Sequence, residues 1–290
     1  MFSGSIVALV TPFKNGNFDE KAFSDLIEWH IAQGTHAIVP CGSTGEAATL
    51  DRDEHCRVIE VAVKTVNKRI PVIAGTGANA TNEAIDITTK AEKLGADGAI
   101  LITPYYNKPT QEGLYRHYKA VAAAVGIPIV LYNVPGRTAV NMLPTTVARL
   151  AECKNIVAIK EATGDLKQVS ELIRLCGDRM AVLSGDDFTT LPLLALGGKG
   201  VISVTANIVP GDMAEMCNAW DRGDLAKARE LHFKLEPLNT VMFIETNPIP
   251  VKTALALMGK LSEEFRLPLC EMSPANKEKL KGVLKNVGII

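Results

Sequence analysis

Short apolar runs recur along the chain, starting roughly 20 to 35 residues apart. They are rich in Val, Ile, Leu and Ala and show little alternation with polar residues, which is typical of strands buried on both faces. The eight runs are Ser5–Val10, His36–Pro40, Ile70–Ala74, Gly98–Thr103, Ile127–Tyr132, Ile156–Lys160, Met180–Ser184 and Gly200–Val204.

The segments between these runs carry a helical pattern of apolar residues. Apolar positions spaced by three and four residues place one apolar stripe along a helix. The clearest stripes comprise Phe23, Leu26, Ile27, His30 and Ile31, and later Leu166, Val169, Leu172 and Ile173. Glycines such as Gly34 and Gly126 precede several runs and mark the ends of the helices.

This alternation predicts an α/β fold of parallel β/α units, and eight strands are the number that closes a (β/α)8 TIM barrel. We expect residues 1–223 to form the barrel and residues 224–290 to form a C-terminal helical extension packed on it. Helices are predicted from Gly211 onward at Gly211–Arg222, Asp224–Phe243, Pro250–Met258 and Pro274–Leu284. An open doubly wound sheet is the alternative, but no G-x-G-x-x-G follows the first run.

Composition narrows the class of protein. The net charge of −1 offers no electrostatic footprint for nucleic acid or an anionic membrane. No apolar run reaches the roughly 18 residues that cross a bilayer, and the N-terminus lacks the pattern of a signal peptide. The six cysteines are scattered, without a C-x-x-C pair, so we expect neither disulfides nor a zinc site and favour a reducing cytoplasm. The five histidines show no ligand spacing, so no metal or other cofactor is expected.

In such a barrel the chemistry lies at the carboxyl ends of the strands. The segments there are CGSTGEA, AGTGANAT, ITPYYNKP, LYNVPGRT, KEATGD, SGDDF and VTANI. They bring hydroxyls, tyrosines, one arginine and one lysine to one face. The segment LGGKG precedes the last strand instead, so it is a helix-to-strand turn on the opposite face rather than a phosphate loop.

Lys160 ends an apolar strand without a break. A strand-end lysine that extends into water is the ordinary interpretation. The buried strand and crowded polar face favour a dehydrated amine instead, because loss of water disfavours the charged form of a lysine. A neutral amine attacks carbonyl carbons to form a Schiff base, which assists making or breaking of the adjacent carbon–carbon bond.

The loop at residues 42–47 offers a site for a small carboxylate. Its glycines allow close approach of a ligand, and Ser43, Thr44 and free N–H groups can bind the anion. Plain helix capping is the alternative. The close acidic pair Asp186 and Asp187 is interpreted as a solvated turn or a helix start.

Three further side chains are candidates for the site because they come together on the same face of the barrel. None of them would be singled out by itself. Tyr132 and Tyr106 carry phenols suited to proton transfer, although either alone is better explained by aromatic packing. Arg137 follows a Pro-Gly turn and can bind a second carboxylate with two hydrogen bonds, unless it is a surface arginine.

The segments G-S-T-G-E, Y-Y-N-K-P, Y-N-V-P-G-R-T and I-K-E-A-T-G-D, in this order and spacing, resemble the dihydrodipicolinate synthase family. This family lies within the N-acetylneuraminate lyase superfamily of Schiff-base aldolases, and the resemblance covers essentially the whole chain. It implies that Lys160 forms an imine with pyruvate, that Tyr132 moves protons to and from it, and that Thr44 holds the pyruvate carboxylate. Ile202 matches a backbone contact to pyruvate, with Gly185 nearby.

The resemblance also assigns roles around this imine. Ser43 stands where the family usually has a threonine in a proton relay, which keeps the hydroxyl but leaves the relay's fine geometry open. Tyr106 matches a relay tyrosine donated across a dimer interface. Arg137 matches the arginine that receives the carboxylate of L-aspartate 4-semialdehyde.

The implied reaction condenses pyruvate with that semialdehyde to give 4-hydroxy-tetrahydrodipicolinate, a step of lysine (diaminopimelate) biosynthesis. N-Acetylneuraminate or 2-keto-3-deoxy sugar-acid lyase is the enzymatic alternative, although Arg137 favours an acceptor with a carboxylate. A catalytically silent, ligand-binding barrel is the alternative from another class.

Feedback by lysine and assembly are further implications of the resemblance. An interface pocket of lysine-sensitive members matches residues Ala48, His55, Asn79, Glu83 and Tyr105, although His55 and Glu83 could equally lie on a helix surface. Arg52 replaces a histidine found in some sensitive members, and its charge disfavours lysine. The family further implies a homotetramer built as a dimer of dimers, which the sequence itself does not test.

Overall fold

The computed structural model describes residues 2–290 and shows a closed barrel of eight parallel strands. Around the barrel the order is β4-β1-β10-β9-β8-β7-β6-β5, and a parallel bridge between Ile38 and Val72 joins the two end strands. Every strand of the barrel overlaps a predicted apolar run, so the TIM-barrel prediction is confirmed. The strands are β1 Gly4–Ala8, β4 Ala37–Val39, β5 Ile73–Gly75, β6 Gly98–Ile102, β7 Ile129–Asn133, β8 Ile156–Glu161, β9 Ala181–Ser184 and β10 Gly200–Ser203.

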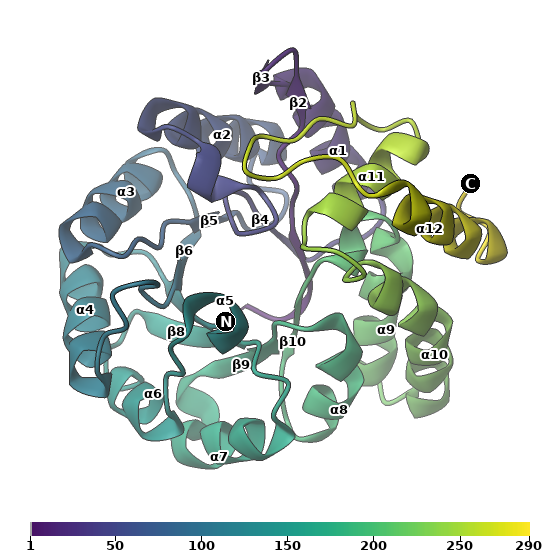
Figure 1. Cartoon of the computed structure of the whole chain (residues 1–290). Coiled ribbons are helices and arrows are strands. Elements are labelled where there is room, and N and C mark those ends of the chain that lie inside the picture. Colours follow the sequence, from purple (N-terminus) through teal and green to yellow (C-terminus); the bar gives the residue numbers. More distant parts are fainter. Residues whose placement is uncertain (1) are drawn as a thin grey trace.

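Helices surround the strands, as the view along the barrel shows (Figure 1). They are α1 Glu20–Ala32, α2 Arg52–Val66, α3 Thr81–Lys93, α4 Gln111–Ala124, α5 Pro135–Thr138, α6 Pro144–Leu150, α7 Leu166–Cys176, α8 Thr190–Ala195 and α9 Pro210–Asp221. Short 3-10 turns lie at η1 Ala47–Thr49, η2 Gly177–Arg179, η3 Asp187–Thr189 and η4 Thr205–Asn207. Four of the five residues of the predicted α1 stripe are buried, namely Phe23, Leu26, Ile27 and His30, and Ile31 is half-buried.

The barrel interior is filled by side chains rather than open. Ile6, Ile73, Val130 and Ile202 belong to one buried cluster inside the ring of strands. Larger apolar clusters lie between strands and helices. Burial on both faces explains why the strands show no polar alternation, and the filled interior leaves only the ends of the barrel for a site.

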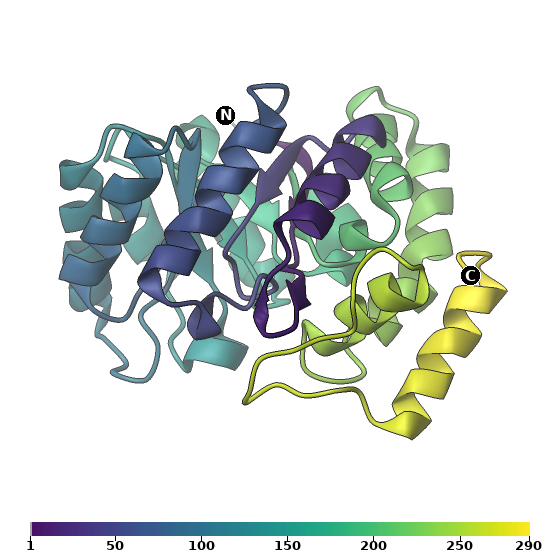
Figure 2. The same cartoon turned by 90° about the horizontal axis from the view of Figure 1, so that it is seen from above.

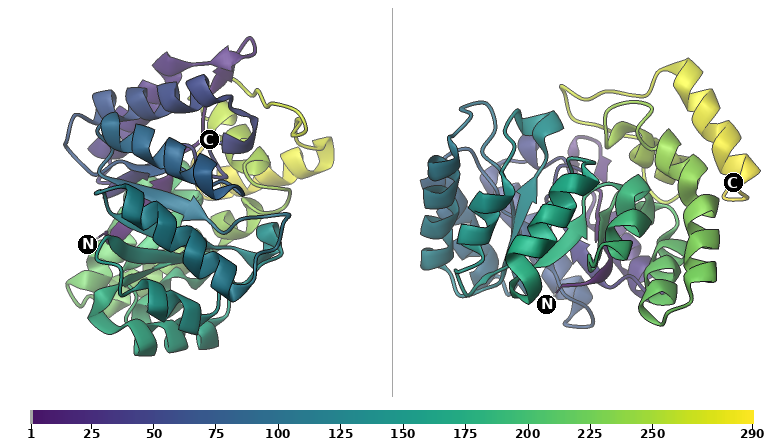
Figure 3. Two further views of the ribbon diagram at one scale, coloured as in Figure 1. Left: turned by 90° about the vertical axis from the view of Figure 1, so that its left-hand side faces the viewer. Right: turned by 90° about the horizontal axis from the view of Figure 1, so that it is seen from below.

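The C-terminal extension consists of α10 Leu225–Val241, α11 Ile249–Leu257 and α12 Pro274–Asn286. It packs to one side of the barrel, with α12 outermost (Figures 2 and 3). One apolar cluster contains Val7 and Val204 of the barrel together with Leu255 and Leu280 of the extension. The extension therefore shares a core with the barrel. None of the helices within residues 2–290 is long and apolar enough to cross a membrane.

A small hairpin between β1 and α1 was not predicted. Its strands are β2 Phe13–Lys14 and β3 Asn17–Phe18, which pair antiparallel. The turn residues Asn15 and Gly16 have φ of 53° and 80°. An Asn-Gly pair is the preferred sequence for a two-residue turn with positive φ, so the signal was present but brief. Fully buried Phe13 fixes the hairpin against the core.

Candidate active site

A cavity of about 560 Å³ opens at the carboxyl ends of the strands. Most of the predicted catalytic and substrate-binding side chains meet in it, although they come from distant segments of the chain. The cavity walls include Ser43, Thr44, Tyr132, Arg137, Lys160 and Gly185, together with Phe243, Asn247 and Leu269 of the extension.

Lys160 faces this cavity and not bulk solvent. Strands β7 and β8 pair in register so that Tyr132 lies directly opposite Lys160. Lys160 is 6% exposed, and its Nζ lies 4.4 Å from the centre of the Tyr132 ring. The face of a phenol attracts a cation at this distance, and both residues line the same cavity. The predicted lysine and tyrosine therefore form one site.

Glu161 follows Lys160 but points to the opposite side of β8, because side chains alternate along a strand. Its carboxylate accepts hydrogen bonds from Asn133 Nδ2 at 3.1 Å, Thr163 N at 2.9 Å and Gln168 Nε2 at 3.3 Å. Burial raises the pKa of Glu161, and these hydrogen bonds oppose the rise. The carboxylate ties the end of β8 to its neighbours and so helps to hold Lys160 in place.

The loop that carries Ser43 and Thr44 is held in an unusual backbone conformation. Cys41 and Glu46 flank it with φ of 55° and 53°, in the left-handed region that costs non-glycine residues energy. Thr11 Oγ1 donates to the Gly45 carbonyl at 2.7 Å. Such a conformation persists only where surrounding contacts enforce it, so this loop is a preformed part of the site.

Asn247 connects two groups that were predicted to bind carboxylates. Its Nδ2 donates to Thr44 Oγ1 at 3.0 Å, and its carbonyl accepts from Arg137 Nη2 at 3.0 Å. It lies between α10 and α11, 203 residues from Thr44 and 110 from Arg137. Sequence reasoning missed it because no local pattern in the extension indicates a contact with the barrel mouth.

The interpretation of Asp186 and Asp187 as a solvated turn is wrong, whereas the helix start is confirmed because η3 begins at Asp187. Asp187 is 1% exposed, and its Oδ2 accepts hydrogen bonds from the N–H groups of Val204 and Thr205 at 3.1 and 3.0 Å. Asp186 lines the cavity. Burial raises the pKa of Asp186 to about 6, although nearby Lys160 acts in the opposite direction.

Gly185, Tyr106 and Ile202 lie in three different places. Gly185 lines the cavity, and a Cβ there would lie 2.5 Å from that of Ala162, so only glycine fits. Tyr106 is 90% exposed with φ of 70° and extends away from the chain. Ile202 is fully buried in the barrel interior, paired with Ile6, and lies outside the cavity lining. The roles of these three residues stay predictions.

Four of the five residues assigned to a lysine pocket line the outer part of the same cavity: Ala48, His55, Glu83 and Tyr105. Asn79 lies outside this lining, and its carbonyl accepts from Asn107 Nδ2 at 2.9 Å.

Two of these residues have partners within the chain. The alternative that His55 is a helix-surface residue is wrong, because His55 is 8% exposed and its Nε2 donates to the Gly75 carbonyl at 2.7 Å. Glu83 pairs with Arg52 at 3.1 Å, and Arg52 also contacts Asp86. Any ammonium group that approaches Glu83 therefore meets a guanidinium already bound there.

Within residues 2–290, no group of three or more His, Cys, Asp or Glu side chains is placed to hold a metal ion. The six cysteines are all free thiols. The functional groups that the cavity offers include an amine, phenols, hydroxyls, a guanidinium and backbone amides, beside carboxylates such as that of Asp186. These groups suit covalent imine chemistry and recognition of carboxylates.

Comparison with known proteins agrees with this chemistry. The Dihydrodipicolinate synthetase family matches residues 1–287. The 4-hydroxy-tetrahydrodipicolinate synthase of Thermodesulfovibrio yellowstonii is 75% identical over 290 residues, which is the whole of both chains.

Solved structures show the same fold. A dihydrodipicolinate synthase from Acinetobacter baumannii, complexed with pyruvate, has a TM-score of 0.98 and 53% identity, covering 100% of both chains. That from Cyanidioschyzon merolae, with lysine bound, has a TM-score of 0.97 and 40% identity, covering 100% of this chain and 99% of the other. With its fold, its cavity and its sequence in agreement, the chain belongs to the dihydrodipicolinate synthetase family.

Proposed function

We propose that the protein condenses pyruvate with L-aspartate 4-semialdehyde through a Schiff base on Lys160, and releases 4-hydroxy-tetrahydrodipicolinate for lysine (diaminopimelate) biosynthesis. The observation that carries this proposal is the buried Lys160 amine, 4.4 Å from the Tyr132 ring centre in a cavity that also contains Thr44 and Arg137. The name of the 75% identical relative supports the same reaction.

The cavity suggests how the steps are divided. The Ser43–Thr44 loop binds the pyruvate carboxylate, and the Lys160 amine attacks the keto carbon. Loss of water gives the iminium ion, and loss of a methyl proton gives the enamine. Tyr132, opposite Lys160 in the register, is the proposed carrier of these protons.

The enamine carbon then attacks the aldehyde carbon of the acceptor, whose oxygen takes up a proton to become the 4-hydroxyl group. The acceptor's own amino group next adds to the imine carbon and displaces Lys160 as the ring closes. Arg137, which lines the cavity, is the proposed binding group for the acceptor's carboxylate. The substrate of a sugar-acid lyase has no carboxylate at the position that faces Arg137. This makes a sugar-acid lyase the weaker candidate.

Borohydride trapping tests the proposal. Incubation with pyruvate and borohydride is expected to add one reduced pyruvate to the peptide that contains Lys160. A Lys160→Met variant should show no adduct, and a variant at the exposed Lys167 of α7, Lys167→Met, should react like the wild type. An unlabelled wild-type Lys160 would favour the silent, ligand-binding barrel.

Steady-state assays with each acceptor separate the enzymatic alternatives. We expect turnover of the semialdehyde and none of N-acetylneuraminate or 2-keto-3-deoxy sugar acids. The reverse preference would assign the protein to the lyases.

We also propose that the working enzyme is a homotetramer, a dimer of dimers, located in the cytoplasm. Tyr105 and Tyr106 are 40% and 90% exposed, so their loop offers aromatic surface for contact with a second subunit. A partner's cavity is the proposed destination of Tyr106, as in the relay that the family resemblance implies. Free thiols at all six cysteines suit a reducing compartment.

Inhibition by lysine is proposed at the outer part of the cavity, where Glu83 would bind the ammonium group. The relative from Cyanidioschyzon merolae was solved with lysine bound. Because Arg52 already pairs with Glu83, inhibition is expected only at millimolar lysine and should strengthen in Arg52→His. Arg57→His is the control, since Arg57 pairs with Glu20 and Glu60 instead. An unchanged rate at millimolar lysine in both wild type and Arg52→His would remove the idea.

A further inference from the structure

A fully buried ion pair joins the loop at residues 42–47, which we call the keto-acid loop, to the C-terminal extension. Lys252 Nζ of α11 lies 2.5 Å from Glu46 Oε1, and the two side chains are 0% and 1% exposed. Glu46 is the last residue of the G-S-T-G-E segment, two residues after Thr44. None of the catalytic steps described above uses this pair.

The position of Glu46 governs the geometry of the loop. Its N–H donates to the Ser43 carbonyl at 3.2 Å, and its own carbonyl accepts from Thr49 N at 3.0 Å. With φ of 53° it is held in the left-handed region, where a non-glycine residue stays only under constraint. A displacement of the Glu46 side chain therefore shifts the Ser43–Thr44 backbone.

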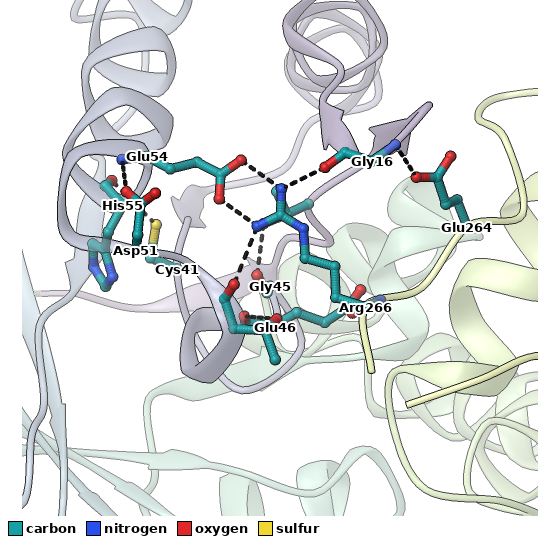
Figure 4. Close-up of polar contacts among 11 residues, drawn as sticks. Gly16, Cys41, Gly45, Glu46, Asp51, Glu54, His55, Glu264 and Arg266 are labelled. Carbon is teal, nitrogen blue, oxygen red and sulfur yellow. Dashed lines mark hydrogen bonds and ion pairs between the residues drawn. The ribbon is translucent and has the colours of Figure 1, made fainter. Parts of the chain in front are cut away.

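Arg266 of the extension holds the far side of the same loop (Figure 4). Its guanidinium donates to Glu54 Oε1 at 2.6 Å, to the Thr49 carbonyl at 3.1 Å and to the Gly16 carbonyl at 2.9 Å. Its backbone N–H lies 3.4 Å from Glu46 Oε2. The carboxylate of Glu46 thus has a partner from the extension at each oxygen.

Net stabilisation does not account for burying these two charges. Dehydration offsets most of the attraction within a buried ion pair, and apolar replacements of both partners are often as stable. Burial lowers the pKa of Lys252, and Glu46 opposes this. The rings of Phe13 and Phe265 lie 4.3 and 5.1 Å from the amine and also favour its charged form. What the pair supplies is a fixed direction for the Glu46 side chain.

We infer that Lys252 is a positioning residue for the keto acid: through Glu46 it holds Thr44 where the hydroxyl and backbone of the loop meet the substrate carboxylate. The inference rests on the proposed function. Lys252 touches no substrate, so its removal should weaken capture of pyruvate more than the later chemistry.

The first test is Lys252→Met. We expect KM for pyruvate to rise about tenfold or more, because small misplacements of a binding group are costly. KM for the semialdehyde and kcat should each change by less than about threefold, since Arg137 and Lys160 stay in place. Lys277→Met is the matched control: Lys277 pairs with Glu263 inside the extension and touches no loop residue.

The double variant Glu46→Gln/Lys252→Met separates positioning from simple charge neutralisation. It leaves no unpaired buried charge, so its Tm is expected to recover toward the wild-type value. KM for pyruvate should stay at least about fivefold raised, because the loop is still detached from α11. If Lys252→Met fails to fold, the Tm and the pyruvate KM of the double variant alone test the inference.

Two results would overturn the inference: pyruvate KM within twofold of wild type in Lys252→Met, or a pyruvate KM that recovers together with Tm in the double variant. A parallel rise of both KM values would also contradict it, since general loosening of the site acts on both substrates. In parallel, the wild-type protein is incubated with pyruvate and borohydride to test for the Lys160 adduct. A missing adduct there would overturn the proposed function, whereas a normal adduct with unchanged KM in the variants would overturn only the role of Lys252.

Discussion

Lys160 and Glu161 are consecutive residues of one strand, yet they lie in different surroundings. Alternation of side chains turns the amine into the cavity and the carboxylate toward the surrounding helices. Both are buried, at 6% and 2% exposure. The chemistry of the site therefore depends on the strand register, since a slip by one residue would place the carboxylate where the amine is needed.

Asp186 offers a prediction at the same scale. Its pKa is about 6 in the folded protein and 3.8 in an unfolded chain, so folding favours the protonated form. This contribution to stability is present below pH 3.8 and is lost as pH rises through about 6. The unfolding free energy of Asp186→Asn minus that of wild type should therefore be larger at pH 7.5 than at pH 4.5, by at most about 3 kcal/mol.

Urea unfolding of both proteins at the two pH values measures this gain. Asp178→Asn is the control, because Asp178 is exposed in η2 far from Lys160. Equal stability differences between Asp186→Asn and wild type at pH 4.5 and 7.5 would contradict the assignment.

Residues whose role follows from their own element could be predicted from the sequence. Lys160 and Tyr132 end apolar strands, and Thr44 lies in a glycine-flanked loop, so local pattern and barrel topology together place them. Asn247 and Lys252 could not be found in this way. Their partners Thr44 and Glu46 are 203 and 206 residues away, and no apolar periodicity or motif indicates either contact.

At the scale of the element, the eight strands were predictable because burial on both faces leaves an uninterrupted apolar run. The hairpin of β2 and β3 was not predicted, because each strand has two residues, which are too few to show a periodic pattern. It is held by tertiary contacts instead. Glu264 of the extension accepts hydrogen bonds from the N–H groups of Asn15 and Gly16 at 2.8 and 2.6 Å.

The end of β5 gives a prediction for an element. A Cβ at Gly75 would lie 2.0 Å from the Cys41 carbonyl oxygen and 3.0 Å from Gly42 N, both backbone atoms. Gly75→Ala must therefore push the keto-acid loop away from β5. We expect a loss of about 1–3 kcal/mol in unfolding free energy and a rise in KM for pyruvate.

The control for this change is Gly282→Ala in α12, where a Cβ meets nothing within 4 Å. It should stabilise by about 0.5–1 kcal/mol, because alanine favours a helix interior. Thermal unfolding and pyruvate saturation curves check both variants. A Gly75→Ala protein with the wild-type KM for pyruvate would show that the end of β5 does not determine the position of the keto-acid loop.

For the whole molecule, assembly decides whether the site is complete. Lys160 and Tyr132 share one subunit, but Tyr106 is 90% exposed and extends away from it. If Tyr106 serves a partner's cavity, Tyr106→Phe and Lys160→Met should each be nearly inactive alone. When the two variants are mixed, hybrid dimers contain one intact site, and about a quarter of the wild-type activity should return.

Mixing Tyr132→Phe with Lys160→Met provides the control, because those two residues belong to the same cavity and no hybrid site is intact. Activity that fails to return in the first mixture, under conditions where subunits exchange, would place Tyr106 outside the reaction.

The ion pair between Glu46 and Lys252 spans 206 residues. A growing chain emerges from its N-terminus onward, so all eight strands and the lysine nucleophile leave the ribosome before the amine that fixes the keto-acid loop. Until α11 docks, Glu46 lacks its counter-charge and the keto-acid loop lacks its contact with the extension. The ability to bind the substrate is thus acquired late in synthesis. It requires the finished polypeptide, and not only the barrel that carries the nucleophile.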